Sequence, residues 1–228
     1  MKDTNDKELF YDNFASQFDS KMNMYDTNKR VHIIFDKLLG EEDLEGKSLL
    51  DAGCGTGWFS KKANERRAVV TSMDIGEKLL KQVKLKCKTT RIVGSVLDIP
   101  FEDSTFDYVI SSEVIEHTPD PLYAINEFHR VLKPGGLLVV TTPNRFWYFS
   151  LVIAQKLKLR PYQGIENWIS WKKFVNKHKE LNLKIKEERG IHLFPFVHPV
   201  FYPILDFFNN YSHSLKRFMV NMAIASRK

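Results

Sequence analysis

The sequence predicts an α/β protein built on a mostly parallel β-sheet. From Lys47 onward, short runs rich in β-forming residues alternate with helical patterns, which is typical of parallel βαβ units. The chain has 228 residues, of which 43% are hydrophobic and 27% are charged. A globular chain of this length and composition can bury a core of its own without a disulfide or a metal.

The expected elements follow from the period of the apolar residues and from the turn residues between them. Two helices, over residues 6–20 and 26–39, precede the alternating part. Strands are expected over residues 48–52, 68–73, 90–93, 106–111, 137–142, 184–189 and 218–225, and helices over residues 58–65, 77–86, 121–132 and 146–157.

Composition says less about the cellular environment of the protein and about its partners than about its fold. The formal net charge is +6, and the lysines are scattered, so the sequence carries no strong nucleic-acid signal. The polar N-terminus has no secretory signal, and we expect a cytoplasmic protein. No apolar run is long enough to span a membrane, and the aromatic segment 194–208 at most makes a peripheral membrane contact. Cys54 and Cys87 are interpreted as free thiols.

A glycine-rich turn follows the first predicted strand. Residues 49–57 read LLDAGCGTG, so Asp51 precedes Gly53, Gly55 and Gly57 at G-x-G-x-G spacing. Glycine permits a sharp turn and close approach of a ligand to the backbone, and the next helix offers its first N–H groups. A dinucleotide-binding turn would have glycine at position 58, where Trp58 stands, so S-adenosylmethionine (SAM) is favoured over NAD. A ligand-free tight turn is the alternative.

Two aspartates follow the next two predicted strands. Asp74 ends the second strand, where a carboxylate can accept both hydroxyls of an adenosine ribose. Asp98 lies in the segment LDIPF after the third strand, where it can accept a hydrogen bond from an adenine amino group. A helix-capping role for Asp74 and a simple turn role for Asp98 are the alternatives.

These motifs together resemble those of class I SAM-dependent methyltransferases over residues 47–144. The glycine loop, Asp74 and the segments 96–101, 106–110 (FDYVI) and 132–136 (LKPGG) occur in that family's order and spacing. The resemblance is greatest to methyltransferases of type 11 and the ubiquinone-biosynthesis O-methyltransferases. It implies a Rossmann-like, seven-stranded sheet that is mostly parallel, with an antiparallel last strand at residues 218–225, helices on both faces and an N-terminal helical cap.

The resemblance also implies roles for single residues around the cofactor. An arginine of the N-terminal helix is expected to bind the carboxylate of SAM, and Arg30 is the nearest match; a solvated surface arginine is the alternative. The other implied contacts are Asp51, Gly53, Gly55 and Gly57 with the methionine portion, Asp74 with the ribose, and Ile75, Asp98 and Ile99 with the adenine.

Residues 113–121, EVIEHTPDP, contain an acidic and imidazole cluster. If this segment is helical, Glu113, Glu116 and His117 share one face. Such residues can bind a divalent cation, or His117 can act without a metal as the general base beside Glu116. The segment resembles that of O-methyltransferases acting on polyprenyl-catechol quinone precursors. We predict His117 and Glu116 as catalytic residues, expect no metal requirement, and keep a structural helix cap as the alternative.

The whole chain, residues 1–228, is interpreted as one methyltransferase domain in three parts. These are the N-terminal helical cap (1–46), the cofactor-binding core (47–144), and the substrate-side insertions with the last strands (145–228). Regular alternation lapses between residues 142 and 184, and a second irregular aromatic segment lies at 194–210. Because loops at strand ends carry function, these insertions are expected to select the substrate.

The predicted reaction is transfer of a methyl group from SAM to an oxygen of a small or lipid-linked molecule similar to a quinone precursor. Aromatic residues at 146–149, 168–171 and 194–208 can line an apolar acceptor site, or can simply pack the insertions onto the sheet. The alternatives are a methyltransferase of RNA or another macromolecule and a non-catalytic SAM-binding protein. A monomer or homodimer is expected.

Overall fold

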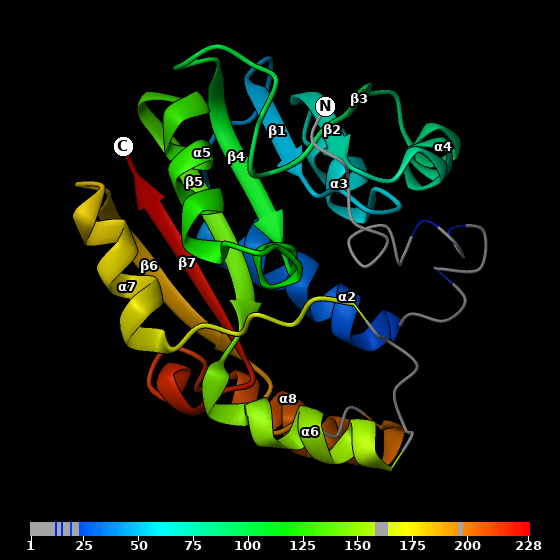
Figure 1. Cartoon of the computed structure of the whole chain (residues 1–228), viewed down its shortest axis with the longest axis vertical. Helices are drawn as coiled ribbons and strands as arrows, with labels where there is room; N and C mark the ends of the chain where they lie inside the picture. The colour runs from blue at the N-terminus through cyan, green and yellow to red at the C-terminus, as the bar shows by residue number, and fades with distance from the viewer. Residues whose placement is uncertain (1–11, 13–14, 16–18, 20–22, 158–163, 196–197) are drawn as a thin grey trace.

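A seven-stranded sheet organises the computed structural model of the chain (Figure 1). The structure describes Asp12, Ala15, Asp19 and residues 23–157, 164–195 and 198–228. The strand order is β3-β2-β1-β4-β5-β7-β6; β1 to β5 are parallel, and β7 runs antiparallel to both β5 and β6. The predicted mixed sheet with an antiparallel last strand is therefore confirmed.

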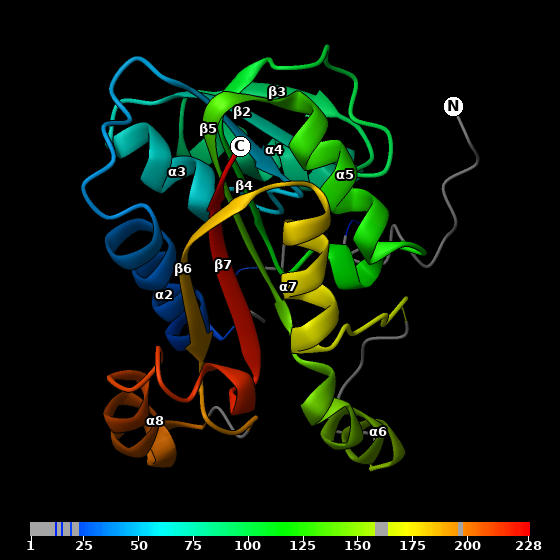
Figure 2. The same ribbon diagram turned by 90° about the vertical axis from the view of Figure 1, so that its left-hand side faces the viewer.

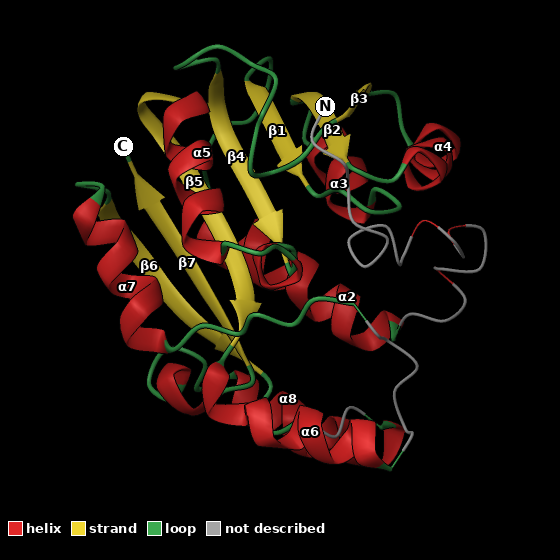
Figure 3. Ribbon diagram, viewed as in Figure 1, coloured by secondary structure: helices red, strands yellow, loops and turns green. Residues whose placement is uncertain are grey.

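The elements alternate along the chain as the sequence predicted (Figure 3). The strands are β1 (Ser48–Ala52), β2 (Val69–Asp74), β3 (Thr90–Val93), β4 (Phe106–Ser112), β5 (Leu132–Pro143), β6 (Lys184–Ile191) and β7 (Asn221–Arg227). The helices and shorter helical turns are α2 (Met24–His32), η2 (Ile33–Leu38), α3 (Trp58–Glu65), α4 (Glu77–Lys86), η3 (Ile115–His117), α5 (Pro121–Val131), η4 (Arg145–Trp147), α6 (Tyr148–Lys156), α7 (Trp171–Glu180), η5 (Pro199–Phe201), α8 (Tyr202–Asn209) and η6 (Lys216–Phe218).

Side chains on the two faces of the sheet form two separate cores. Leu50, Val109 and Val140 face α5 and α7, whereas their neighbours in sequence face η2 and α3. This alternation follows from the two-residue period of a β-strand. Figure 2 shows α5 and α7 on one side of the sheet and α2 and α3 on the other. Helices therefore cover both faces, as a buried parallel sheet requires.

The strand predictions differ from the structure mainly at β5, which begins at Leu132 and not at residue 137, and at the C-terminal end. The last strand begins at Asn221, not at residue 218, because residues 216–218 form the turn η6. The side chain of Asn144 donates hydrogen bonds to the carbonyls of Arg217 and Met219 at 2.9 and 3.2 Å, which ties this turn to the end of β5. A buried side chain from a distant part of the chain therefore helps to set where β7 begins.

The segments expected to be irregular contain two helices that the sequence analysis missed. Ser170 caps α7 by accepting a hydrogen bond from the N–H of Lys173, and Phe174 and His178 are buried one turn apart. The second missed helix, α8, occupies the aromatic segment 194–210. By contrast, the helix predicted over residues 26–39 is present as α2 and η2, with Asn23 as its N-cap. The helix predicted over residues 6–20 lies mostly outside the described residues.

The predicted N-terminal cap is attached to the core partly through Arg66, which follows α3. Its guanidinium donates hydrogen bonds to the carbonyls of Phe35, Gly40 and Glu42 at 3.0, 3.0 and 2.7 Å. These carbonyls belong to η2 and the loop after it, where backbone acceptors lack partners in the helix. The Arg66 side chain thereby provides hydrogen-bond donors for three backbone carbonyls at the end of the N-terminal helical unit.

Arg66→Ala is expected to lower the free energy of unfolding by about 2 kcal/mol, because three backbone acceptors lose a charged donor. Arg67→Ala is the matched control, since the Arg67 side chain is 73% exposed and pairs only at the surface with Glu45. Urea unfolding followed by circular dichroism measures both. Equal effects of the two substitutions would contradict the assigned role of Arg66.

Candidate functional site

A pocket of about 60 Å³ lies at the carboxyl ends of the parallel strands. The chain crosses from β3 to β4 on the other side of β1, so loops from neighbouring strands diverge at this point. Ligands of open α/β sheets bind in such a crevice. The lining residues come from the ends of four strands: Gly53, Asp74, Ile75, Gly94, Ser95, Val96, Leu97, Val114, His117, Thr118 and Pro119.

The glycine loop brings the ends of β1 and β4 together. Gly53 has φ +78°, and a Cβ at this position would lie 2.4 Å from both Cγ atoms of Val114. Gly57 has φ +87° and precedes α3, whose first turn has no side-chain cap. The backbone amides at the start of α3 are therefore available to a polar ligand. Only a residue without a side chain fits the turn at Gly53.

Asp74 is fixed at the end of β2 by backbone donors. Its Oδ2 accepts from the N–H of Gly55 at 2.8 Å, and its Oδ1 accepts from the N–H of Gly76 at 2.9 Å. The side chain is buried and lines the pocket beside Ile75. Burial raises the pKa of Asp74, while the backbone hydrogen bonds oppose that rise. A carboxylate oriented in this way can still accept hydrogen bonds from two ligand hydroxyls.

Asp51 lies deeper than the other predicted cofactor contacts. It is 1% exposed, and its Oδ2 accepts a hydrogen bond of 2.6 Å from the Ser60 hydroxyl, which also contacts Ser72. Burial raises the pKa of Asp51 to about 7, against the effect of Ser60. Asp51, Gly55 and Gly57 are not among the described residues that line the pocket. Asp51 is therefore tied to α3 through Ser60. The contacts of Asp51, Gly55 and Gly57 with the methionine portion of the cofactor stay predictions.

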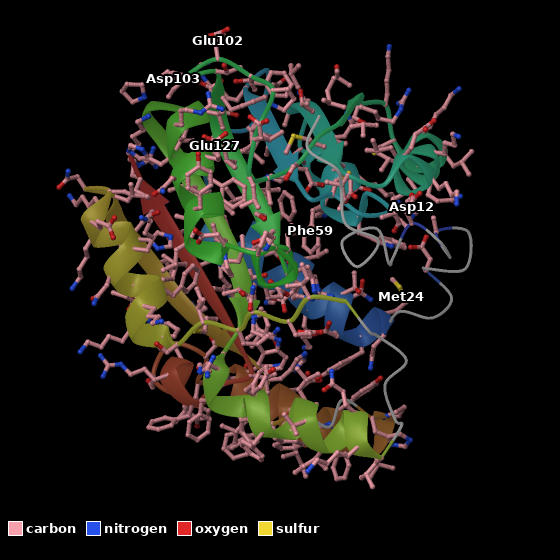
Figure 4. The ribbon with its side chains drawn as sticks, in the orientation of Figure 1. Asp12, Met24, Phe59, Glu102, Asp103 and Glu127 are labelled. Atoms are coloured by element: carbon pink, nitrogen blue, oxygen red, sulfur yellow. The ribbon has the colours of Figure 1, made fainter. Side chains whose placement is uncertain are left out.

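The predicted adenine contacts divide between the pocket wall, the surface and the core. Ile75 lines the pocket, whereas Asp98 is exposed and is not among the described lining residues. Ile99 is buried in the core, where its N–H donates to Glu127 at 2.9 Å; Figure 4 shows Glu127 on α5. The structure instead places the neighbouring segment 94–97 against the pocket. A contact between Asp98 and adenine stays a prediction.

The cluster at residues 113–117 does not have the helical form on which the metal hypothesis depended. Glu113 has φ +56°, and only the short turn η3 (Ile115–His117) follows it. Glu113 and Glu116 accept hydrogen bonds from Thr141 and Thr142 on β5 at 2.8 and 3.1 Å. Within the described part of the chain, no group of three or more His, Cys, Asp or Glu residues is arranged to hold a metal ion.

His117 faces the pocket with a defined ring orientation. Its Nδ1 lies 3.0 Å from the carbonyl oxygen of Ile165, so Nδ1 carries the proton in the neutral ring and Nε2 is the basic nitrogen. The Nε2 atom lies 3.9 Å from a carboxylate oxygen of Glu116. The backbone N–H of Asn167 donates to the carbonyl of Glu116 at 2.7 Å. The segment after α6 thereby holds His117 in place, an arrangement the sequence did not reveal.

Arg30 lies in a buried cluster of charged groups with Asp26 and His192. It pairs with Asp26 at 2.8 Å, and His192 approaches the other oxygen of Asp26 at 3.0 Å. Burial favours the neutral forms, but Arg30 and His192 lower the pKa of Asp26 to about 2. Likewise Asp26 and Glu113 outweigh burial and raise the pKa of Arg30. Arg30 is not a described lining residue of the pocket, and its contact with a cofactor carboxylate stays a prediction.

The N-terminal residues contact the glycine loop through side chains that the sequence analysis did not single out. Asp19 accepts hydrogen bonds from the Thr56 hydroxyl at 2.6 Å and the Trp58 indole at 3.1 Å, and it pairs with Lys86. Asp12, beside the start of α4 in Figure 4, accepts from the N–H groups of residues 78 and 79. These aspartates give no signal in sequence, because their partners are distant along the chain.

The comparisons with known proteins agree with this geometry. A family model described as "Methyltransferase domain" matches residues 50–140. The ubiquinone biosynthesis O-methyltransferase of Vibrio parahaemolyticus is 34% identical over 137 residues, which are 56% of this chain and 57% of that protein. The protein of the same name from Pseudomonas aeruginosa is 32% identical over 164 residues, which are 65% of this chain and 69% of that protein. The chain thus spans little more than half the length of the Vibrio relative.

Solved structures show the same fold at lower sequence identity. A SAM-dependent methyltransferase from Archaeoglobus fulgidus superposes with a TM-score of 0.65 at 18% identity, over 94% of this chain and 99% of that chain. One from Mesorhizobium loti superposes with a TM-score of 0.63 at 17% identity, over 82% of this chain and 93% of that chain. The fold and the glycine-loop pocket define a class I methyltransferase architecture.

The chain belongs to the SAM-dependent methyltransferase family that includes the ubiquinone biosynthesis O-methyltransferases. The methyltransferase family predicted from the sequence is therefore confirmed. The residues of the pocket fit SAM: the buried Asp74 carboxylate lines the pocket together with Gly53 and Ile75, and it can accept hydrogen bonds from ribose hydroxyls.

Asp51→Asn is expected to make stability less dependent on pH. The folded pKa of about 7 exceeds the ordinary value of 3.8, so the native state binds the extra proton and wild-type stability falls as pH rises between these values. The variant should gain about 2 kcal/mol of unfolding free energy over wild type between about pH 5 and about pH 8. Chemical denaturation at both pH values measures this gain.

Asp107→Asn is the control for that experiment. Hydrogen bonds from Ser48 and Lys133 outweigh burial and lower the pKa of Asp107 to about 2. The stability that Asp107 contributes is fully present above its ordinary pKa and is lost only as pH falls through its pKa in the folded state. The change in unfolding free energy caused by Asp107→Asn should therefore be constant between about pH 5 and about pH 8. A gain in unfolding free energy for Asp51→Asn that does not change with pH would contradict the raised pKa of Asp51.

Proposed function

We propose that this chain transfers a methyl group from SAM to an oxygen atom of a small or lipid-linked molecule. The observation that carries the proposal is the convergence of Gly53, Asp74 and His117 on one pocket at the ends of β1, β2 and β4. SAM supplies a methyl group already activated on a sulfonium. The protein must therefore hold the donor, align the acceptor and manage one proton.

Donor binding is assigned to the glycine loop and to Asp74. The Asp74 carboxylate is held by the N–H groups of Gly55 and Gly76, so its orientation is set before a ligand arrives. Ile75 and Val96 provide apolar contacts in the same pocket. We assign the ribose hydroxyls to Asp74 and the adenine to this apolar wall.

Proton transfer is assigned to His117. Its Nε2 is the basic nitrogen of a ring that lines the pocket and is held by the carbonyl of Ile165. An imidazole is well suited to take a hydroxyl proton near neutral pH. Glu116 is buried, and burial together with repulsion from Glu113 raises its pKa well above the ordinary range. We assign Glu116 the role of positioning His117, and the chemistry needs no metal.

The acceptor class is inferred from the relatives and from the surroundings of the pocket. Both relatives are named for ubiquinone biosynthesis, in which the methylated atom is an oxygen according to their names. In this chain Trp168 packs edge-to-face against Tyr148 beside the segment that holds His117. An apolar acceptor with a hydroxyl group suits this setting. The cytoplasmic location and the monomeric or dimeric state stay predictions.

Asp74→Asn should weaken binding of S-adenosylhomocysteine by about tenfold to a hundredfold, because a ribose hydroxyl loses a charged acceptor. Asp103→Asn is the control, since the Asp103 side chain is 76% exposed and lies away from the pocket, at the turn labelled in Figure 4. Isothermal titration calorimetry measures both affinities. Unchanged affinity in Asp74→Asn would remove Asp74 from the cofactor site.

Methyl transfer is tested by incubating the purified chain with methyl-labelled SAM and a host extract, then counting label in lipid, small-molecule, RNA and protein fractions. Label is expected in the lipid or small-molecule fraction, with and without EDTA. His117→Ala should lower turnover by about a hundredfold or more while cofactor affinity stays nearly constant. His213→Ala is the control, because this exposed histidine lies outside the pocket.

Each contrary outcome of the transfer assay identifies a different error. Label confined to RNA would replace the proposed acceptor by a nucleic acid. Wild-type turnover in His117→Ala would exclude this residue as the base. Bound S-adenosylhomocysteine without label in any fraction would favour a SAM-binding protein that is not an enzyme.

A further inference from the structure

One exposed residue, Asn167, contacts the backbone on both sides of His117. The N–H of Asn167 donates a hydrogen bond to the carbonyl of Glu116 at 2.7 Å. Its side-chain Nδ2 donates to the carbonyl of Thr118 at 2.8 Å and, at the longer distance of 3.4 Å, to that of Pro119. The residue before His117 and the two residues after it are therefore bound by a single asparagine.

The turn that carries His117 has few hydrogen bonds of its own. It is the three-residue 3₁₀ turn η3, and it has no side-chain cap at its start. The N–H groups of residues 117 and 118 donate to the carbonyls of residues 114 and 115 at 2.9 and 3.1 Å. The carbonyl of Glu116 belongs to a residue that is 2% exposed, so it requires a donor from elsewhere in the chain. Asn167 supplies that donor.

The orientation of the Asn167 side chain follows from its partners. A carboxamide has an oxygen that accepts hydrogen bonds and a nitrogen that donates them. Both partners, on Thr118 and Pro119, are carbonyl oxygens, which can only accept. The nitrogen must therefore face them. An aspartate would have the same shape but would place an acceptor against two acceptors, so this position selects an amide.

The segment that contains Asn167 also holds the ring of His117. The carbonyl of Ile165, two residues before Asn167, lies 3.0 Å from Nδ1 of the ring. A neutral histidine in water favours the proton on Nε2, whereas a carbonyl at Nδ1 favours the proton there and leaves Nε2 basic. The ring and the backbone of His117 are thus held by the same short segment, and a shift between the two would break the bond to Ile165.

The far end of this segment is fixed to the sheet, and Figure 1 shows that it leads into α7. Ile169 is 7% exposed and packs in the larger core. Its carbonyl accepts from the N–H of Arg145, which follows β5, at 3.0 Å. Ser170 then caps α7. Residues 165–169 are therefore a supported element, and Asn167 connects that support to η3.

We propose that Asn167 is a positioning residue for His117. By holding the carbonyls of Glu116 and Thr118, it keeps the ring against the carbonyl of Ile165 and thereby keeps the proton on Nδ1. The inference deepens the proposed function and rests on it in one respect, since the basic Nε2 serves methyl transfer only if His117 is the base.

The test is nuclear magnetic resonance of the nitrogen-15-labelled full chain at about pH 9, where histidine rings are ordinarily neutral. Long-range proton–nitrogen spectra distinguish protonated from unprotonated ring nitrogens, and the spectrum of His117→Ala assigns the His117 signals. The wild-type ring should carry its proton on Nδ1. In Asn167→Asp the ratio of the Nδ1-protonated to the Nε2-protonated form should fall by about tenfold, because the ring is no longer held against Ile165.

Asn64→Asp is the matched control. Asn64 also donates through its side-chain nitrogen to a distant backbone carbonyl, that of Lys88 at 3.3 Å, but it lies on α3. This variant should keep the wild-type tautomer of His117. Asn167→Ala removes the side-chain donors without adding a charge and keeps the backbone N–H, so it should shift the ratio in the same direction by a smaller factor. Thermal melting and S-adenosylhomocysteine binding check that each variant is folded.

An unchanged tautomer ratio in both Asn167 variants, an equal change in Asn64→Asp, or a wild-type ring protonated on Nε2 would overturn the proposal. The methyl-transfer assay tests the proposed function separately. Wild type that transfers no methyl group to any fraction would remove the proposed function and leave the tautomer result standing. A shifted tautomer with wild-type turnover would overturn the assignment of His117 as the base.

Discussion

The contact between Gly53 and Val114 is the constraint around which the site is built. A Cβ at Gly53 would lie 2.4 Å from the Val114 side chain, so the turn after β1 and the segment after β4 pack too closely for a side chain at position 53. The parallel register of β1 with its neighbours then fixes what surrounds this point. Asp74 at the end of β2 and His117 in the segment after β4 both line one small pocket.

Several carboxyl groups are buried around the pocket in this architecture. Burial raises the pKa of Asp51, Asp74 and Glu113, so it favours the protonated form of these carboxyl groups around the pocket. Stabilising pairs lie elsewhere, for example between Glu127 and Arg130 on α5. Such a division is common when binding sites are arranged for a ligand and the scaffold supplies the stability.

The sequence was sufficient to predict the parallel core of the sheet, but it was not sufficient to predict the segments that surround that core. The periods of apolar residues marked β1 to β4 and helices α3 to α5, because each unit packs locally on the sheet. Other features depend on contacts between residues far apart in sequence. Examples are the support of His117 by Ile165 and the contact of His192 with Asp26, the partner of Arg30. The left-handed backbone at Glu113 also had no signal in the sequence. Helix α8 was missed because its aromatic residues and proline suggested an irregular segment. Pro203 lies in the first turn, where a helix tolerates proline.

Asp19 attaches the N-terminal part of the chain to the glycine loop by a few side-chain contacts. Asp19 contacts Thr56 and Trp58 through single hydrogen bonds, each worth about 1 kcal/mol net, and it also pairs with Lys86. Such contacts open far more often than the sheet unfolds. These contacts can therefore open and close many times while the sheet that carries Asp74 and His117 stays intact.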